Sequence, residues 1–177
     1  MMSVTRHDLI PSDTLIAACA PDDPLERAET HLDCYTADVE STVDLGGFIE
    51  AFYTSLPFRI ERRILSFAAH LPSTDAEVRA LAAGEVDQFA AWTVESRKPD
   101  EILLRDMEDK TKSWLRVEPA SGGAGTRLYF GSVVTASIHP RTGKPHLGRA
   151  FRAFMPVHGM YSRILLGSAR ARLARTI

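Results

Sequence analysis

The stretch of the chain that decides the fold is residues 147–175, which read LGRAFRAFMPVHGMYSRILLGSARARLAR. A set of residues in it recurs at steps of three and four, which is the spacing of one face of an α-helix: Leu147, Phe151, Phe154, His158, Tyr161, Leu165 and Ser168. The sequence therefore predicts a long amphipathic helix in this stretch. Pro156 falls inside it, where a proline kinks a helix or splits it in two.

The segments before this helix have the length of β-strands and are separated by short polar turns. They cover residues 89–96, 101–107, 111–117 and 127–136, with turns at 99–100, 109–110 and 121–125. Turns this short and this rich in Gly, Pro and Asp are typical of antiparallel hairpins. The predicted antiparallel sheet offers the helix a surface on which to bury its apolar face.

The first half of the chain adds one strand and two to three short helices. Residues 31–39 lack a helical period and predict a strand, with residues 1–29 before it as an N-terminal extension that has room for a short helix. Helices are predicted over residues 45–52, capped by Asp44 or Ser41, and over 57–71. A third helix begins at a capping box of Thr74 and Glu77 and ends at Gly84.

Composition and charge fit one domain without a membrane segment. The 177 residues are 45% hydrophobic and 25% charged, close to the averages of globular chains. No apolar run is long enough for a transmembrane helix. The two cysteines, Cys19 and Cys34, form no CxxC pair, so we expect buried or idle thiols in a cytoplasmic protein.

The charges are separated along the chain, although the net charge is only −2. All 23 acidic residues lie in the first 118 residues, together with 12 of the 21 basic ones. The basic C-terminal helix therefore either folds back over the acidic part or attracts an anionic surface, such as a membrane. We favour the first interpretation and expect no nucleic-acid partner, because opposite charges need not mark separate surfaces in one compact domain. The arginines in question are Arg149, Arg152, Arg163, Arg170 and Arg172.

Several short segments resemble a bacterial family of uncharacterised domains in the START-like (SRPBCC, helix-grip) superfamily. The resemblance covers about residues 30–175 and rests on Trp92 and Val94, on the segments 102–105, 113–115 and 126–128, on Gly148-Arg149 and on Pro156-Val157-His158. It implies an α+β fold in a single domain, residues 1–177, with a curved antiparallel sheet gripping the long C-terminal helix. It also implies a partly apolar cavity between the sheet and that helix.

Strand parity and the helical stripe indicate which residues line such a cavity. Residues 128, 130, 132 and 134 form the more apolar face of the last strand, whereas Trp114 shares the opposite face with Lys112 and Arg116 and is predicted to lie outside the core. His158 and Tyr161 place polar atoms on the apolar stripe. His158 would then need a hydrogen-bond partner, which is a ligand, a backbone carbonyl or a water molecule. The predicted ligand-binding residues are Trp92, Leu115, Phe130, Phe154, His158 and Tyr161.

The motifs do not favour catalysis or a cofactor. His139, His146 and His158 lack the spacing of a zinc site, so no metal is predicted. His31, Asp33 and Tyr35 share one side of a strand, and we interpret this alternation as a partly exposed edge strand rather than a histidine oriented by a carboxylate.

The sequence predicts non-catalytic binding of a hydrophobic or amphipathic small molecule. One alternative is an enzyme of the polyketide cyclase or dehydratase kind, with His158 as acid or base. The other is an interaction module that uses the basic C-terminal helix.

Overall fold

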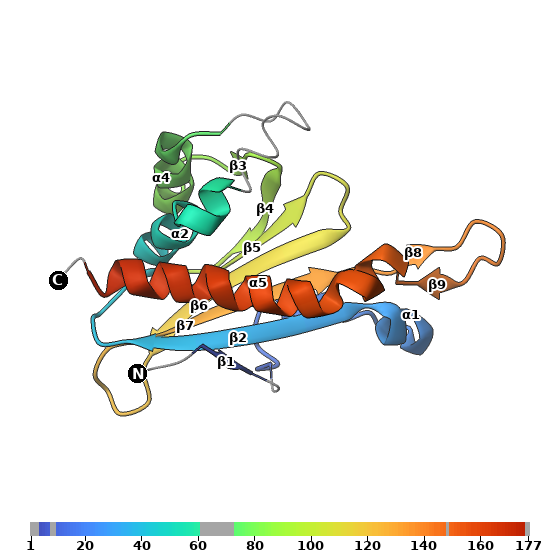
Figure 1. The fold of residues 1–177 in the computed structure, drawn as a ribbon, viewed down its shortest axis with the longest axis horizontal. Helices are drawn as coiled ribbons and strands as arrows, with labels where there is room; N and C mark the ends of the chain where they lie inside the picture. Colours follow the sequence, from blue (N-terminus) through green and yellow to red (C-terminus); the bar gives the residue numbers. More distant parts are fainter. Residues whose placement is uncertain (1–3, 8–9, 61–72, 148, 176–177) are drawn as a thin grey trace.

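An antiparallel sheet crossed by one long helix dominates the computed structural model (Figure 1). The structure describes residues 4–7, 10–60, 73–147 and 149–175, and only the backbone of residues 149–151, 154 and 156. Within these residues the main sheet has seven strands in the order β1-β2-β7-β6-β5-β4-β3. The predicted α+β class is confirmed. The strands are β1 (Thr5–Arg6), β2 (His31–Val39), β3 (Gln88–Phe89), β4 (Trp92–Arg97), β5 (Glu101–Asp106), β6 (Thr111–Pro119) and β7 (Thr126–Val134).

The first long strand and the last one lie side by side. β2 pairs with β7 along its whole length, from His31 opposite Val134 to Val39 opposite Thr126. The strands from β4 to β7 follow one another as an antiparallel meander, as their short turns predict. The β2–β7 pairing places a strand from the first quarter of the chain beside the last long strand before the C-terminal helix.

The strand pattern differs from the prediction in three places. The predicted strand 89–96 is divided into β3 and β4, because Ala90 takes a positive φ of 51° and turns the chain. Residues 137–146 form an additional hairpin of β8 (Ser137–Ile138) and β9 (Pro145–His146). The N-terminal extension holds β1, the 3-10 helix η1 (Ala17–Cys19) and the helix α1 (Pro24–Glu29), capped by Asp23. Short elements of this kind leave too little periodicity to be recognised.

The short helices begin and end where their capping residues predict. α2 (Leu45–Tyr53) starts at Asp44, whose side chain accepts a hydrogen bond from the backbone N–H of Gly47 at 2.7 Å. α4 (Asp75–Ala83) starts at a complete capping box of Thr74 and Glu77 and ends at Gly84 in the left-handed conformation. Of the helix predicted over 57–71, residues 57–60 are helical and residues 61–71 lie outside the described residues.

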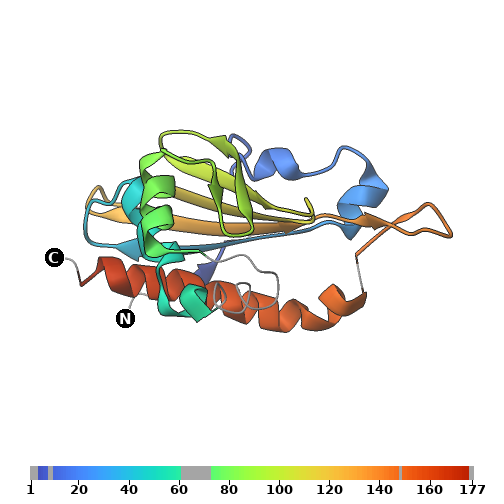
Figure 2. The same cartoon turned by 90° about the horizontal axis from the view of Figure 1, so that it is seen from above.

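The C-terminal helix α5 (Arg149–Leu173) runs as one helix past Pro156 rather than as two. It lies along one face of the sheet (Figure 2), where it packs on α2 and β2. Ser162, Leu165, Leu166 and Ala169 are buried there. The predicted packing of the helix on the sheet is confirmed, but of these four residues only Leu165 belongs to the predicted stripe, and Tyr161 and Ser168 are half-buried at the edge of the buried face.

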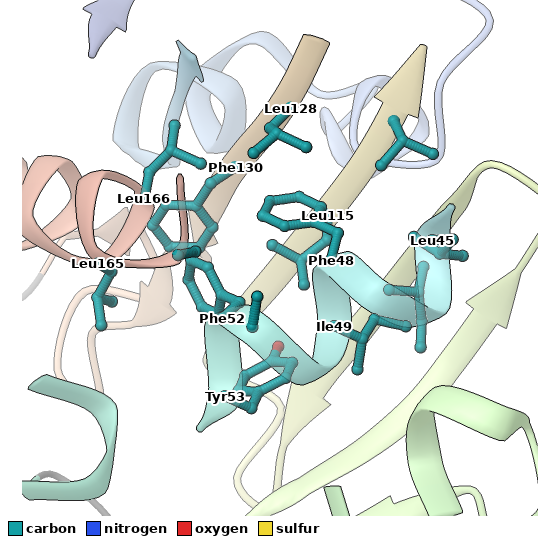
Figure 3. Packing of buried hydrophobic residues seen from close by; sticks show 14 of the residues in the cluster. Leu45, Phe48, Ile49, Phe52, Tyr53, Leu115, Leu128, Phe130, Leu165 and Leu166 are labelled. Carbon is teal, nitrogen blue, oxygen red and sulfur yellow. The ribbon is translucent and has the colours of Figure 1, made fainter. Parts of the chain in front are cut away.

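The main hydrophobic core fills the space between the sheet, α2 and α5. Figure 3 shows Phe48, Phe52 and Tyr53 of α2 among side chains of the sheet and of α5. The ring centroids of Phe52 and Phe130 lie 4.7 Å apart. Burial of aromatic side chains on this scale contributes most of the stability of a small core. The other labelled members are Leu45, Ile49, Leu115, Leu128, Leu165 and Leu166.

A second, smaller core lies on the opposite face of the sheet and corrects the prediction for Trp114. Its side chain does point away from Leu115, but it is fully buried, because the N-terminal extension covers that face (Figure 2). Ile16 packs over it, and Gly131 provides the room: a Cβ on Gly131 would lie 2.4 Å from Ile16 Cδ1. The prediction failed because strand alternation gives the face of a residue but does not show what covers that face.

Among the helices of the described part of the chain, none combines the length and the apolar character that crossing a bilayer requires.

Candidate functional site

A row of polar side chains crosses the otherwise apolar inner face of the sheet. Ser113 of β6 pairs in register with Ser132 of β7, and Ser132 pairs with Asp33 of β2. All three are buried. Buried polar groups need hydrogen-bond partners, and Ser113 Oγ finds one in Tyr53 Oη at 3.1 Å. A polar row inside a core costs stability unless it is paired, which marks it as a candidate functional site.

Asp33 forms the centre of a cluster with two histidines. Ser132 Oγ donates to Asp33 Oδ1 at 2.6 Å, while His31 Nε2 and His158 Nε2 approach Oδ2 at 3.3 and 3.4 Å. His158 Nε2 also lies 2.9 Å from Ser132 Oγ. The two imidazole rings are T-shaped, with centroids 5.7 Å apart. Strand β2 and helix α5 thus contribute one histidine each to a shared carboxylate.

Burial and hydrogen bonding act in opposite directions on this carboxyl group. Burial raises the pKa of Asp33, but the hydrogen bonds from His158, His31 and Ser132 outweigh burial, and the pKa lies well below its ordinary value. Asp33 is therefore a carboxylate at neutral pH. Burial of the neighbouring Cys34 thiol and, second, the negative charge of Asp33 raise the pKa of that thiol to about 12, which keeps it protonated and unreactive.

The cluster does not have the geometry of a serine nucleophile. In a Ser-His-Asp triad the carboxylate binds one ring nitrogen of the histidine and the serine binds the other. Here Ser132 and Asp33 both contact Nε2 of His158, and the Ser132 hydroxyl donates directly to the carboxylate. His158 is therefore not placed to take the proton of Ser132 on one ring nitrogen while Asp33 holds the other.

One side of the cluster opens into an apolar cavity of about 160 Å³. Five of the twelve residues that line it are Phe, Tyr or Trp, and His158 and Ser132 contribute polar atoms. The indole Nε1 of Trp92 is buried, and no described residue accepts a hydrogen bond from it. The cavity is lined by Phe52, Phe58, Trp92, Thr111, Lys112, Ser113, Phe130, Ser132, His158, Tyr161, Ser162 and Leu165.

The other side of the cluster opens into a more polar cavity of about 260 Å³. Gly159 keeps space there, since a Cβ on it would lie 2.9 Å from Tyr35 Oη. The Arg163 guanidinium lies 5.5 Å from the centre of the Tyr35 ring. This cavity is lined by Arg6, His31, Asp33, Tyr35, Met155, Gly159 and Arg163.

Most of the predicted ligand-binding residues meet at the apolar cavity. Trp92, Phe130, His158 and Tyr161 all line it. Leu115 is instead fully buried in the core and does not reach the cavity wall. The side chain of Phe154 lies outside the described part of the structure.

The structure corrects the interpretation of the strand that carries His31 and adds partners for His158. The alternation of His31, Asp33 and Tyr35 does not come from an exposed edge strand, because β2 pairs with β7 and its inner face is covered, leaving Asp33 and Tyr35 buried. His158 Nε2 contacts the side chains of Ser132 and Asp33, two partners that the sequence did not predict. His31 and Asp33 at period two were the signal for this site. Their partner on the helix became visible only with the β2–β7 pairing.

Two further histidines form a separate pair. His139 and His146 lie together at the β8–β9 hairpin, with ring centroids 5.3 Å apart. In the described residues, the group whose donor atoms lie within 4.8 Å of one another is His31, Asp33 and His158. These three are the residues that could hold a metal ion.

The basic helix makes contacts within its own chain. Arg170 Nε donates to the backbone carbonyl of Asp38 at 2.9 Å, and Arg152 forms an ion pair with Glu29. The arginines of α5 therefore hold acidic and carbonyl groups of the first part of the chain.

Comparison of the chain with protein-family models, with curated proteins and with solved structures finds no match.

Proposed function

We propose that the protein binds a small amphipathic molecule in the cavity between the sheet and α5, and that it is a START-like, helix-grip domain. The observation that carries the proposal is the apolar cavity itself, with aromatic walls and a buried indole N–H at Trp92 that no described residue accepts from. The sheet and its long C-terminal helix support the placement in the superfamily.

The size of the cavity narrows the class of ligand. An engineered apolar cavity of about 150 Å³ binds benzene, and this one measures about 160 Å³. A ligand of one aromatic ring or a short aliphatic chain matches that volume. A hydrogen-bond acceptor on such a ligand would pair with the indole N–H of Trp92. Binding is favoured because the ligand supplies a hydrogen bond to a buried donor that has no described acceptor in the free protein.

Cys19 and Cys34 are free thiols, which is typical of proteins in a reducing compartment. We therefore propose that the protein acts in the cytoplasm.

The test uses phenol, which has one ring and one hydroxyl, as the probe. The chain has two tryptophans, so a ¹⁵N-labelled sample shows separate indole N–H resonances for Trp92 and Trp114. Phenol should shift the resonance that Trp92→Phe removes. It should leave the other, because Trp114 Nε1 already donates to Glu101 at 2.7 Å on the opposite face of the sheet.

Trp92→Phe also separates binding from folding. Removing a buried donor from which no described residue accepts should leave the free energy of unfolding within about 1 kcal/mol, while phenol affinity falls at least about fivefold. Benzene, which has no acceptor oxygen, should bind the wild type and Trp92→Phe equally. If phenol shifts neither indole resonance, or shifts only that of Trp114, the proposal is wrong.

A further inference from the structure

We propose that His31, Asp33 and His158 bind a first-row divalent metal ion such as Zn²⁺ or Fe²⁺. Two imidazoles and one carboxylate are a donor set that holds such ions with coordination positions left open. The proposal goes beyond the binding of an apolar ligand and does not depend on it. His31 and Asp33 line the polar cavity, whereas His158 lines the apolar cavity that the proposed ligand occupies, so the metal would lie between the two cavities.

The donor atoms already have separations close to those of a coordination sphere. With metal–ligand bonds of about 2.0–2.1 Å, neighbouring ligand atoms of a tetrahedral site lie about 3.3–3.4 Å apart. Asp33 Oδ2 lies 3.3 Å from His31 Nε2 and 3.4 Å from His158 Nε2. All three donor atoms lie within 4.8 Å of one another. Small rotations of the imidazole rings would therefore be enough to close the site around an ion.

The surroundings hold the carboxylate in the required orientation. Ser132 donates both its hydroxyl, at 2.6 Å, and its backbone N–H, at 3.3 Å, to Asp33 Oδ1. Oδ2 is thereby directed to the histidines. Hydrogen bonds of this kind to a ligating carboxylate orient it and raise metal affinity. In the metal-bound form both Nε2 atoms act as lone-pair donors, so each imidazole carries its proton on Nδ1.

The site combines a buried carboxylate with accessible histidines. The side chain of Asp33 is 2% exposed, whereas those of His31 and His158 are 17% and 21% exposed. The polar cavity of about 260 Å³, which His31 and Asp33 line, provides an entry path and room for a further ligand on the metal. Arg6 and Arg163 line that cavity, and their positive charges favour an anion, such as hydroxide or a carboxylate, at the open position.

The experiment titrates the chelator-treated full chain with Co²⁺, followed by visible absorption, and with Zn²⁺, followed by calorimetry. We expect saturable binding with the d–d bands of a low-coordinate Co²⁺ ion. His31→Ala and His158→Ala should each lower the affinity at least about 100-fold. Ser132→Ala removes the supporting hydroxyl that contacts Asp33 and His158, and it should lower the affinity about 10- to 100-fold. His139→Ala is the matched control, since it removes one member of the other histidine pair, and it should bind like the wild type.

Two results would overturn the proposal. One is the absence of saturable Co²⁺ and Zn²⁺ binding by the wild type, and the other is a loss of affinity in His139→Ala as large as in His31→Ala. Should His158→Ala fail to fold by circular dichroism, His31→Ala decides the question alone, because His31 is partly exposed on a strand that the core already holds. Phenol binding is measured on separate samples, so its failure does not affect the metal result.

Discussion

Replacement of Glu101 by alanine should detach the N-terminal extension from the sheet. Glu101 is 2% exposed and belongs to the outer face of β5. Its Oε2 accepts hydrogen bonds from Trp114 Nε1 at 2.7 Å and from the backbone N–H of Leu15 at 2.9 Å, and its Oε1 lies 2.7 Å from Lys98 Nζ. One carboxylate therefore joins the extension to the core tryptophan.

The size of the effect follows from these contacts. A hydrogen bond to a charged group contributes about 1.5–3 kcal/mol, so the bonds from Trp114 and Leu15 contribute about 3–6 kcal/mol. Removing the buried carboxylate also removes the cost of its desolvation, which offsets part of that loss. We expect Glu101→Ala to lower the free energy of unfolding by about 3 kcal/mol. Lys98→Met, the control, removes an ion-pair partner that is 44% exposed and its hydrogen bond to the backbone carbonyl of Asp13, and both lost contacts together should cost less than Glu101→Ala does, about 1–2 kcal/mol.

The assay is urea denaturation, followed by tryptophan fluorescence, as a function of pH. Burial raises the pKa of Glu101, but its hydrogen bonds from Lys98, Leu15 and Trp114 outweigh burial and lower the pKa below its ordinary value. A lowered pKa in the folded state stabilises the protein above the ordinary pKa, and this stabilisation disappears as the pH falls through the lowered one. The difference between wild type and Glu101→Ala should therefore narrow as the pH falls below the ordinary glutamate pKa of about 4.3. A loss below about 1 kcal/mol at neutral pH, or a difference independent of pH, would refute the reasoning.

Three further substitutions test the packing by urea denaturation. Gly131→Ala should destabilise the protein by about 1–3 kcal/mol, because its Cβ would lie 2.4 Å from the Ile16 side chain. The control is Gly167→Ala on α5, where the nearest atom is 3.6 Å away, and it should be neutral or stabilising. Equal effects of the two substitutions would contradict the close packing of the second core around Gly131. Tyr53→Phe removes the hydrogen bond to Ser113 and should cost about 0.5–1.5 kcal/mol; no loss would show that the polar row does not need this pairing. Thr74→Ala breaks the capping box of α4 and should cost about 1 kcal/mol, so an unchanged midpoint would exclude a stabilising cap.

Local sequence determined where most elements begin and end. Asp44 and the pair of Thr74 and Glu77 cap α2 and α4 as predicted, because a cap is a hydrogen bond between residues two or three positions apart. The Gly-rich turn at 121–125 and the alternation of β7 are equally local, and they assigned Phe130 and Ser132 correctly to the inner face of the sheet.

Only the tertiary structure decided what lies against each face. Trp114 is buried by Ile16, from a segment whose sequence shows no regular period, and that contact exists because the extension returns to the sheet through Glu101. His31 and Asp33 meet His158 because β2 pairs with β7 while α5 crosses both. Such contacts depend on which strands become neighbours. Periodicity, which reports the facing of each residue within its own element, contains no information about that choice.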